Sequence, residues 1–199
     1  SLYQLTIEPG TRFETLVRRG ELIPADDDHC ADLFELTRSL TSGHGLPAYE
    51  ISNHARPGEQ SRHNLTYWRY GDYAGIGPGA HGRRGSLATE RHRKPENYLA
   101  AVARNGHGLS VERPLDAETR AMEALLMGLR LAEGVDLARI AALSGVEEAA
   151  LIDRAAAEKL AALGLAHMTG AHLTVTEQGM PLLDALLAEL VAIEPPQTL

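Results

Sequence analysis

Short apolar runs separated by glycine and proline turns fill residues 1–98, and this pattern predicts short strands around one helix. Residues 2–7 and 49–51 are predicted strands, and residues 73–76 form a third that runs directly into glycines. Between the first two, Pro24 opens a predicted helix. Its apolar face follows helical spacing and is formed by Cys30, Leu33, Phe34, Thr37 and Leu40. A strand, a crossover helix and a second strand make a right-handed parallel unit the default expectation.

Residues 118–199 follow a different pattern, in which leucine and alanine recur at helical spacing. Three amphipathic helices are predicted there, the second ending at Gly145 and the third covering residues 147–163. An alternating β-hairpin at residues 165–175 and a final helix at about residues 180–192 complete the pattern. Three helices, a two-stranded wing and a closing helix are typical of a winged-helix arrangement.

The composition, with 44% hydrophobic and 23% charged residues among 199, supports one ordinary domain or two small ones. Neither a long apolar window nor a signal peptide is present, so we expect a cytoplasmic chain without a membrane span. The chain starts at Ser1 and opens on an apolar run, which suggests an origin in the interior of a longer protein. Cys30 is the single cysteine, so the sequence offers no internal disulfide and no pair of thiolates for zinc or an iron–sulfur cluster.

The net charge of −8 lies almost entirely in the last third of the chain. Residues 118–199 carry 5 Lys and Arg against 12 Asp and Glu, a net charge of −7, whereas residues 1–98 have a net charge of −1. The third predicted helix, which would have to enter a DNA groove, is itself acidic, with four carboxylates against Arg154 and Lys159. Because nonspecific nucleic-acid affinity requires a positive face, we expect no nucleic-acid partner.

Residues 61–82, with the sequence SRHNLTYWRYGDYAGIGPGAHG, hold the densest cluster of candidate functional residues. The glycine spacing at residues 77–82 matches the dinucleotide-binding string G-x-G-x-x-G. That string requires a helix that begins there with free N–H groups, but residues 83–86 read RRGS, and Pro78 removes one donor. The glycines therefore either allow a tight turn or let a flat ligand approach the end of a sheet.

His63 and two neighbouring aromatic residues are the second candidate. A neutral imidazole is a standard axial ligand of heme iron, and Tyr67 and Trp68 offer flat apolar surfaces with polar tips. The alternative is that both aromatic side chains pack in a core and that His63 only hydrogen-bonds a loop. His81 could point toward a ligand over the glycine turn, and Glu50 could either face a cavity or cap a turn.

Long ungapped stretches of the sequence resemble the radical S-adenosylmethionine proteins related to oxygen-independent coproporphyrinogen III oxidase. These stretches are LYQLTIEPGTRF, PAYEISNHARPG, SRHNLTYW, GDYAGIGPGAHG and, near the end, VTEQG. The resemblance is to the C-terminal half of such proteins and covers essentially all 199 residues. The branch of heme chaperones called HemW matches better than the true oxidases. It has a His-Asn-x-x-Tyr-Trp string where the oxidases have an Asn-Phe-Gln-Gly-Tyr-like string.

The resemblance also implies a site and cofactors. The positions that the string associates with heme are His63, Asn64, Tyr67 and Trp68. His63 is then the ligand of heme iron, while Ala80 and His81 match a stretch that approaches S-adenosylmethionine. The Cys-x-x-x-Cys-x-x-Cys motif, which holds the 4Fe-4S cluster that binds and cleaves S-adenosylmethionine, is absent from this chain.

The fold that the resemblance implies is a mixed α/β one with two domains. Residues 1–98 are expected to form part of a truncated, parallel barrel of the radical S-adenosylmethionine type. Residues 99–117, which Gly106 and Pro114 interrupt, are expected to be a connector. Residues 118–199 then form the winged-helix-like α+β C-terminal domain.

The implied function is heme binding and transfer by a chaperone, with heme and an unidentified acceptor protein as partners. The alternative is the oxidative decarboxylation of coproporphyrinogen in porphyrin biosynthesis. The missing cysteines exclude that reaction for this chain alone, which we expect not to be catalytic. Whether the parent protein is an enzyme stays open.

Overall fold

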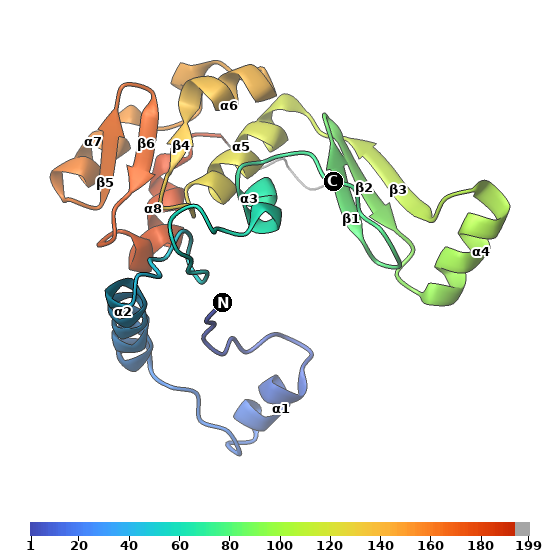
Figure 1. Cartoon of the computed structure of the whole chain (residues 1–199), viewed down its shortest axis with the longest axis horizontal. Coiled ribbons are helices and arrows are strands. Elements are labelled where there is room, and N and C mark those ends of the chain that lie inside the picture. The colour runs from blue at the N-terminus through green and yellow to red at the C-terminus, as the bar shows by residue number, and fades with distance from the viewer. Residues whose placement is uncertain (194–199) are drawn as a thin grey trace. The chain divides into compact units, whose positions relative to one another are not determined.

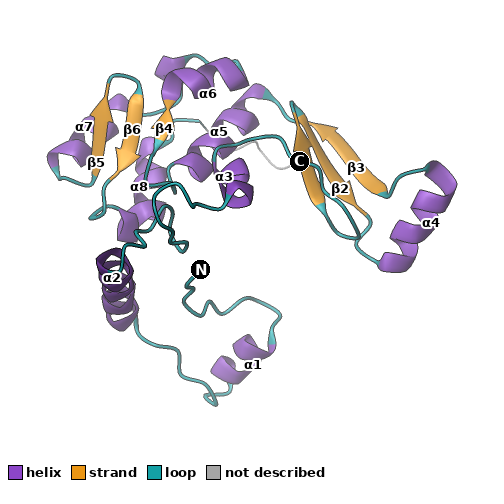
Figure 2. Ribbon diagram, viewed as in Figure 1, coloured by secondary structure: helices purple, strands orange, loops and turns teal. Residues whose placement is uncertain are grey.

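The computed structural model describes residues 1–193 and divides the chain into two compact units, one formed by Ser1–Gln60 and the other beginning at Ser61 (Figure 1). Within the described residues, every strand belongs to the second unit (Figure 2). Because the candidate site also lies in the second unit, its geometry follows from the packing of that unit.

The first unit contains helices α1 (Arg12–Arg18) and α2 (Asp27–Gly43). Helix α2 confirms the predicted helix, although it begins at Asp27 and not near Pro24. The Asp26 carboxylate sets this start, because it accepts a hydrogen bond from the His29 amide at 2.8 Å. Neither helix contains a buried residue, and the apolar face of α2 lines a cavity of about 520 Å³.

The predicted parallel barrel is not formed, which corrects the expectation for residues 1–98. Residues 1–80, all of which the structure describes, contain no strand. The Leu2 amide donates a hydrogen bond to the Ser52 carbonyl at 2.9 Å, but no ladder follows from it. A parallel strand needs a neighbour that runs in the same direction and continues the ladder, and residues 2–7 find none in this chain.

The other two predicted strands are bent by contacts of their own. The carboxylate of Glu50 is buried and accepts hydrogen bonds from the Ser52 amide, at 3.1 Å, and from the Asn53 side chain, so this carboxylate caps a turn. Tyr73 forms an isolated antiparallel bridge with Arg83, which folds residues 73–76 back along the chain. Local side-chain and backbone pairing therefore replaces the predicted parallel strands.

The second unit begins with α3 (Arg62–Trp68) and an antiparallel three-stranded sheet. Its strands are β1 (His81–Arg84), β2 (Leu87–Arg91) and β3 (Leu109–Pro114), in the order β1-β2-β3. Helix α4 (Pro95–Asn105) connects β2 to β3 and ends at Gly106, which has a φ of 76°. The sequence pattern indicated turns here and missed this sheet and its connecting helix.

The rest of the second unit is a helical domain with a second antiparallel sheet. The helices are α5 (Ala117–Gly128), α6 (Leu137–Ser144), α7 (Arg154–Ala162) and α8 (Leu183–Leu190). The strands are β4 (Val135–Asp136), β5 (Ala166–Thr169) and β6 (His172–Val175), in the order β4-β6-β5. The β5–β6 hairpin and the helices on either side of it confirm the predicted succession; the domain boundaries stay a prediction.

The predicted helix at residues 147–163 is interrupted. It consists of a short 3-10 helix (Glu148–Ala150) and α7, separated by the buried Ile152, which forms a bridge with Val191. The Asp153 carboxylate then caps α7 by accepting from the Ala156 amide at 3.0 Å. A pairing with a distant residue therefore breaks a helix that the local spacing favours.

Leucines make up most of the fully buried side chains of the second unit. Leu125 and Leu137 have no exposed surface, and the fully buried set also includes Leu129, Leu151, Leu173 and Leu190. These residues come from the hairpin and from segments on both sides of it, so one core joins residues from α5 to α8. Helix α3, which carries the candidate site, contacts α5 of this domain.

We expect Leu125→Ala to lower the free energy of unfolding by about 2–5 kcal/mol, because it leaves a cavity in a fully buried position. Urea denaturation of the whole chain measures this change. Leu163→Ala is the matched control, since Leu163 is 60% exposed and its truncation should cost less than about 0.5 kcal/mol. Equal losses for the two variants would contradict the placement of the core.

Candidate functional site

Helix α3 carries the His-Asn-x-x-Tyr-Trp string, which the family resemblance associates with heme. Local residues set both ends of this helix. The Ser61 hydroxyl accepts a hydrogen bond from the Asn64 amide at 3.3 Å and so caps the N-terminus. After the helix ends, Tyr70 adopts a left-handed conformation with a φ of 55°, which no helix can continue through. The string is therefore held in a short helix with a sharp exit.

His63 and Tyr67 lie one turn apart on the same face of α3. The His63 Nε2 and the Tyr67 hydroxyl are 3.2 Å apart, and the two rings meet edge to face with centroids 4.8 Å apart. Tyr67 meets Tyr73 in the same manner at 4.4 Å. His63 is exposed, whereas the two tyrosines are half-buried. The structure thus brings together an accessible imidazole and a row of aromatic rings.

Trp68, the last residue of the helix, points in another direction. It is half-buried and lines a cavity of about 240 Å³, whose other walls include Leu131, Val135 and Ile140 of the helical domain. The guanidinium of Arg130 lies 6.0 Å from the centroid of the Trp68 ring. The string is therefore divided between two faces, with His63 and Tyr67 on one and Trp68 against the C-terminal domain.

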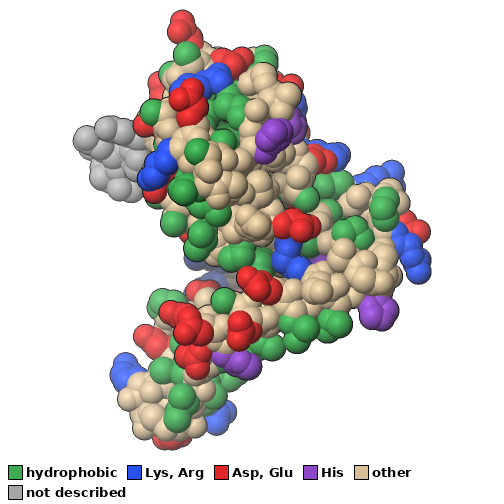
Figure 3. Space-filling model, turned by 90° about the vertical axis from the view of Figure 1, so that its left-hand side faces the viewer, with side chains coloured by type: hydrophobic (Ala, Val, Ile, Leu, Met, Phe, Trp, Pro, Cys, Tyr) green, Lys and Arg blue, Asp and Glu red, His purple; other side chains and the backbone are tan. Residues whose placement is uncertain are grey.

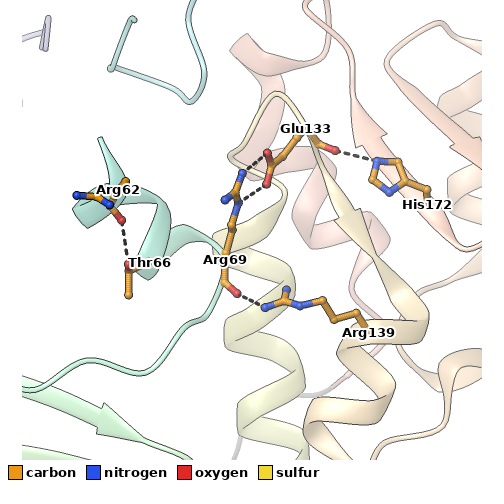
Figure 4. A network of polar contacts seen from close by, with 6 residues as sticks. All are labelled: Arg62, Thr66, Arg69, Glu133, Arg139 and His172. Atoms are coloured by element: carbon orange, nitrogen blue, oxygen red, sulfur yellow. Dashed lines mark hydrogen bonds and ion pairs between the residues drawn. The ribbon is translucent and has the colours of Figure 1, made fainter. Parts of the chain in front are cut away.

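A network of charged residues follows directly after Trp68 (Figure 4). The Arg69 guanidinium donates two hydrogen bonds to the Glu133 carboxylate, at 2.6 and 2.7 Å. Arg139 donates to the Arg69 carbonyl at 2.8 Å, and the His172 ring bonds the Glu133 carbonyl at 2.8 Å. The hydrophobic pattern and the motifs do not point to these residues. The available signal was a basic residue directly after the His-Asn-x-x-Tyr-Trp string, where the dipole of a helix favours positive charge.

The electrostatics of this network follow from its two-pronged ion pair. The hydrogen bonds from Arg69 lower the pKa of Glu133 below its ordinary value, and the same bonds raise the pKa of Arg69. Each of the two side chains is 49% exposed, so water screens the attraction and the contribution to stability is small. The fork still restricts geometry, because both guanidinium–carboxylate bonds must be kept together.

A second polar cluster lies beside Tyr70. The guanidinium of the buried Arg83 lies 3.5 Å from the centroid of the Tyr70 ring, 3.8 Å from the Glu123 carboxylate and within hydrogen-bond distance of the Gly71 carbonyl, at 3.1 Å. The Tyr70 hydroxyl donates to Glu123 at 2.6 Å. Burial and this bond raise the pKa of Tyr70. The cluster connects β1, the exit of α3 and helix α5.

The glycine segment that follows forms a tight turn, as one of the two interpretations expected. Gly77 and Gly79 have φ values of 94° and 71°, and a Cβ on Gly75 would lie 2.1 Å from the His81 carbonyl oxygen. Strand β1 begins at His81, so no helix offers its N–H groups to a pyrophosphate. The match to the dinucleotide-binding string is therefore fortuitous.

Ala80 and His81 occupy the end of this turn. The Ala80 carbonyl accepts a hydrogen bond from the Arg91 amide at 3.0 Å, and His81 is exposed at the start of β1. Their assignment to S-adenosylmethionine stays a prediction. Asn64 is half-buried in α3, and its assignment to heme also stays a prediction.

Residues 1–193 show neither a cluster of metal ligands nor a helix able to span a membrane. No group of three or more His, Cys, Asp or Glu side chains in that range is arranged to hold a metal ion. Cys30, the single cysteine, lies half-buried on α2.

Within residues 1–193, every helix is too short or too polar to cross a membrane. On the face drawn in Figure 3, Lys and Arg side chains are scattered and do not form one patch.

Comparison with known families identifies the helical domain. Residues 115–182 match the HemN C-terminal domain family. The second unit therefore places a helix bearing the His-Asn-x-x-Tyr-Trp string next to a HemN C-terminal domain.

The chain is homologous to the heme chaperones HemW. It is 37% identical over 191 residues to HemW of Mycobacterium tuberculosis H37Rv, covering 96% of this chain and 47% of that protein. For HemW of Bacillus subtilis the identity is 34% over 184 residues, with 90% and 47% covered. The mitochondrial radical S-adenosyl methionine domain-containing protein 1 of Mus musculus is 41% identical over 143 residues, with 68% and 32% covered. The chain thus spans about half the length of these HemW proteins.

One solved structure shares the fold. Coproporphyrinogen III oxidase (HemN) from Escherichia coli, a radical SAM enzyme, matches with a TM-score of 0.62 over 83% of this chain and 41% of that one. The identity is 16%, so this likeness concerns the fold alone.

We expect Trp68 fluorescence to report the protonation of Glu133, because Trp68 is the single tryptophan and adjoins Arg69. The pKa of Glu133 is lower in the folded chain than in the unfolded chain. The ion pair therefore stabilises the fold above the ordinary carboxyl pKa of about 4.3, and this contribution is lost as the pH falls through the lowered value. Trp68 emission should change over that lower range.

Glu133→Gln should remove this transition, and at neutral pH it should cost at most about 1 kcal/mol of stability. Glu189→Gln breaks the exposed Lys159–Glu189 pair, whose atoms are 2.8 Å apart, and should leave the transition in place. A transition that survives in Glu133→Gln would refute the assignment.

Proposed function

We propose that this chain binds heme at helix α3, with the imidazole of His63 as a ligand of heme iron, and passes the heme to an acceptor protein. The homology to HemW heme chaperones over 96% of the chain supports this function. The observation that carries the proposal is that the His63 imidazole, which can bind a metal, is exposed to solvent beside Tyr67. The His63 ring bonds the Tyr67 hydroxyl of its own helix, which favours the ligand role over the alternative in which His63 only bonds a loop.

The aromatic row gives the heme a surface to contact. Tyr67 and Tyr73 follow His63 in edge-to-face contact, at 4.8 and 4.4 Å between successive centroids. Rings arranged in this way present apolar edges and polar hydroxyl groups, which suit a macrocycle with propionate groups. A heme bound through His63 would cover the Tyr67 ring. Iron could bind Nδ1 directly, or Nε2 once the Tyr67 hydroxyl has moved.

Trp68 has a different role in this proposal. Because it lines a cavity of the C-terminal domain, it supports the helix and does not form a wall of the heme site. Its substitution should weaken heme binding by loosening α3. Asn64 keeps its assignment from the resemblance alone.

An exposed site suits transfer. A heme held by one protein ligand and one aromatic face leaves its other face open to a second protein, which can supply a competing ligand. Enclosure would slow release, since differences in affinity arise mainly from the dissociation rate. The open setting of His63 is therefore appropriate for a cargo that is handed on.

S-adenosylmethionine and a 4Fe-4S cluster belong to the proposal only for a protein longer than this chain. Such a cluster needs several cysteine thiolates, and this chain has one cysteine. The exposed His81 side chain, at the end of the glycine turn, is the polar group of this chain that could meet such a ligand. When bound, S-adenosylmethionine would supply radical chemistry; this chain would contribute the backbone and the His81 side chain to its binding.

The test is a hemin titration of the whole chain followed by absorption spectroscopy. We expect His63→Ala to shift the Soret band and to weaken binding about tenfold or more, because the iron loses its axial ligand. Tyr67→Ala should weaken binding with a smaller spectral change, because it removes apolar contact. A lost ligand and a lost surface are thus told apart by the spectrum.

The control addresses adsorption of hemin to apolar surface. The cavity of the first unit is lined by Leu2, Leu5 and Ile23, all more than half exposed, and hemin adheres to such surfaces without a ligand. His92→Ala removes a histidine outside the string and should behave as the unsubstituted chain does. If His63→Ala, His92→Ala and the unsubstituted chain bind hemin alike, the heme-ligand assignment must be withdrawn.

A further inference from the structure

We infer that the Arg69–Glu133 ion pair is a positioning device, through which the HemN C-terminal domain orients the helix that presents His63. This inference rests on the proposed heme binding at His63. It adds a role for residues outside the string, and it gives the C-terminal domain a part in a site to which it contributes no ligand.

Helix α3 cannot hold its conformation alone. It has seven residues, none of them buried, whereas isolated helices shorter than about 12 residues are marginal in water. The hydrogen bond between His63 and Tyr67 requires both residues to be helical. The geometry of the proposed iron ligand therefore depends on contacts made elsewhere along α3.

Those contacts gather at the C-terminal end of the helix. Trp68 lines the cavity that it shares with residues of the helical domain, and the next residue, Arg69, forms the two-pronged bond to Glu133. Arg139, in the first turn of α6, donates to the Arg69 carbonyl (Figure 4). A positive side chain at that carbonyl is also attracted to the negative end of the α3 dipole, which stabilises the helix. The end of α3 is thus fixed to two elements of the domain.

Glu133 is itself held in place. The His172 ring, at the start of β6, bonds the Glu133 carbonyl at 2.8 Å. At the next position, Gly134 has a φ of 68°, and a Cβ there would lie 2.3 Å from the Leu173 carbonyl oxygen. Only glycine permits this approach, so the loop carrying Glu133 is pressed against β6. A rigid loop can transmit orientation through a two-pronged ion pair, whereas a mobile loop could not.

The experiment compares hemin affinity in a double-mutant cycle of His63→Ala and Glu133→Gln, made in the whole chain. We expect Glu133→Gln to weaken hemin binding about twofold to fivefold, because it breaks a two-pronged ion pair that is half-exposed and therefore contributes little. In the His63→Ala background the same substitution should have no further effect, because it acts through His63. An effect of equal size in both backgrounds would overturn the inference.

Two further variants separate positioning from general damage. Glu189→Gln removes an ion pair of similar exposure between α7 and α8 and should leave hemin affinity unchanged. Arg69→Lys keeps the charge but cannot form the fork, so its affinity should lie between those of the unsubstituted chain and Glu133→Gln. If Glu133→Gln fails to fold, as thermal melting would show, the Arg69→Lys result decides, and unchanged affinity there overturns the inference.

The hemin affinities of the variants distinguish a failure of the proposed function from a failure of the positioning role. If His63→Ala binds hemin as the unsubstituted chain does, the proposed function fails and the inference fails with it. If binding depends on His63 but neither Glu133→Gln nor Arg69→Lys weakens it, only the positioning role fails.

Discussion

The seven residues of helix α3 cannot stay helical without help, and this constraint organises the second unit around them. The help comes from the last residue of the helix and the two that follow it: Trp68 lines a cavity shared with the helical domain, Arg69 forms the fork to Glu133, and Tyr70 adopts a left-handed conformation. Each of these contacts joins the string to a segment distant in sequence. His63, near the start of the helix, stays exposed, because these contacts are made at the C-terminal end.

Tyr70 connects the C-terminal end of α3 to the β1–β3 sheet. Its ring packs under the buried guanidinium of Arg83, and its hydroxyl bonds Glu123 of α5. A buried arginine is tolerated because an aromatic face, a carboxylate and a backbone carbonyl surround it. The sheet of β1–β3 and the helical domain are thereby connected through one small polar cluster. Tyr70, which follows the C-terminal end of α3, lies at the centre of this cluster. The position of the His-Asn-x-x-Tyr-Trp string therefore depends on the β1–β3 sheet as well as on the helical domain.

Homology and geometry contribute different parts of the functional argument. The relatives called HemW, of which the chain spans about half, are heme chaperones by name, and the oxidase structure shares the fold at 16% identity. Neither says which residues of this chain meet heme. The geometry narrows that question by separating His63 and Tyr67, which are accessible together, from Trp68, which packs against the domain. It also separates the candidate site from the apolar cavity of the first unit, where hemin could adsorb without any ligand.

The sequence by itself indicated the succession of helices and hairpin in residues 118–193, helix α2 and a turn at the glycines, and through the resemblance it named His63, Asn64, Tyr67 and Trp68 as candidates. Those features depend on neighbours a few residues apart, through helical spacing, capping and turn geometry. Only the tertiary structure decided that residues 1–80 contain no parallel strand, and that a bridge from Ile152 to Val191 interrupts a predicted helix. It alone decided that the string is split between two faces and that Arg69 meets Glu133, 64 residues away. Strand ladders, bridges and ion pairs join surfaces brought together by the whole fold, and no local pattern of residue types specifies which surfaces will meet.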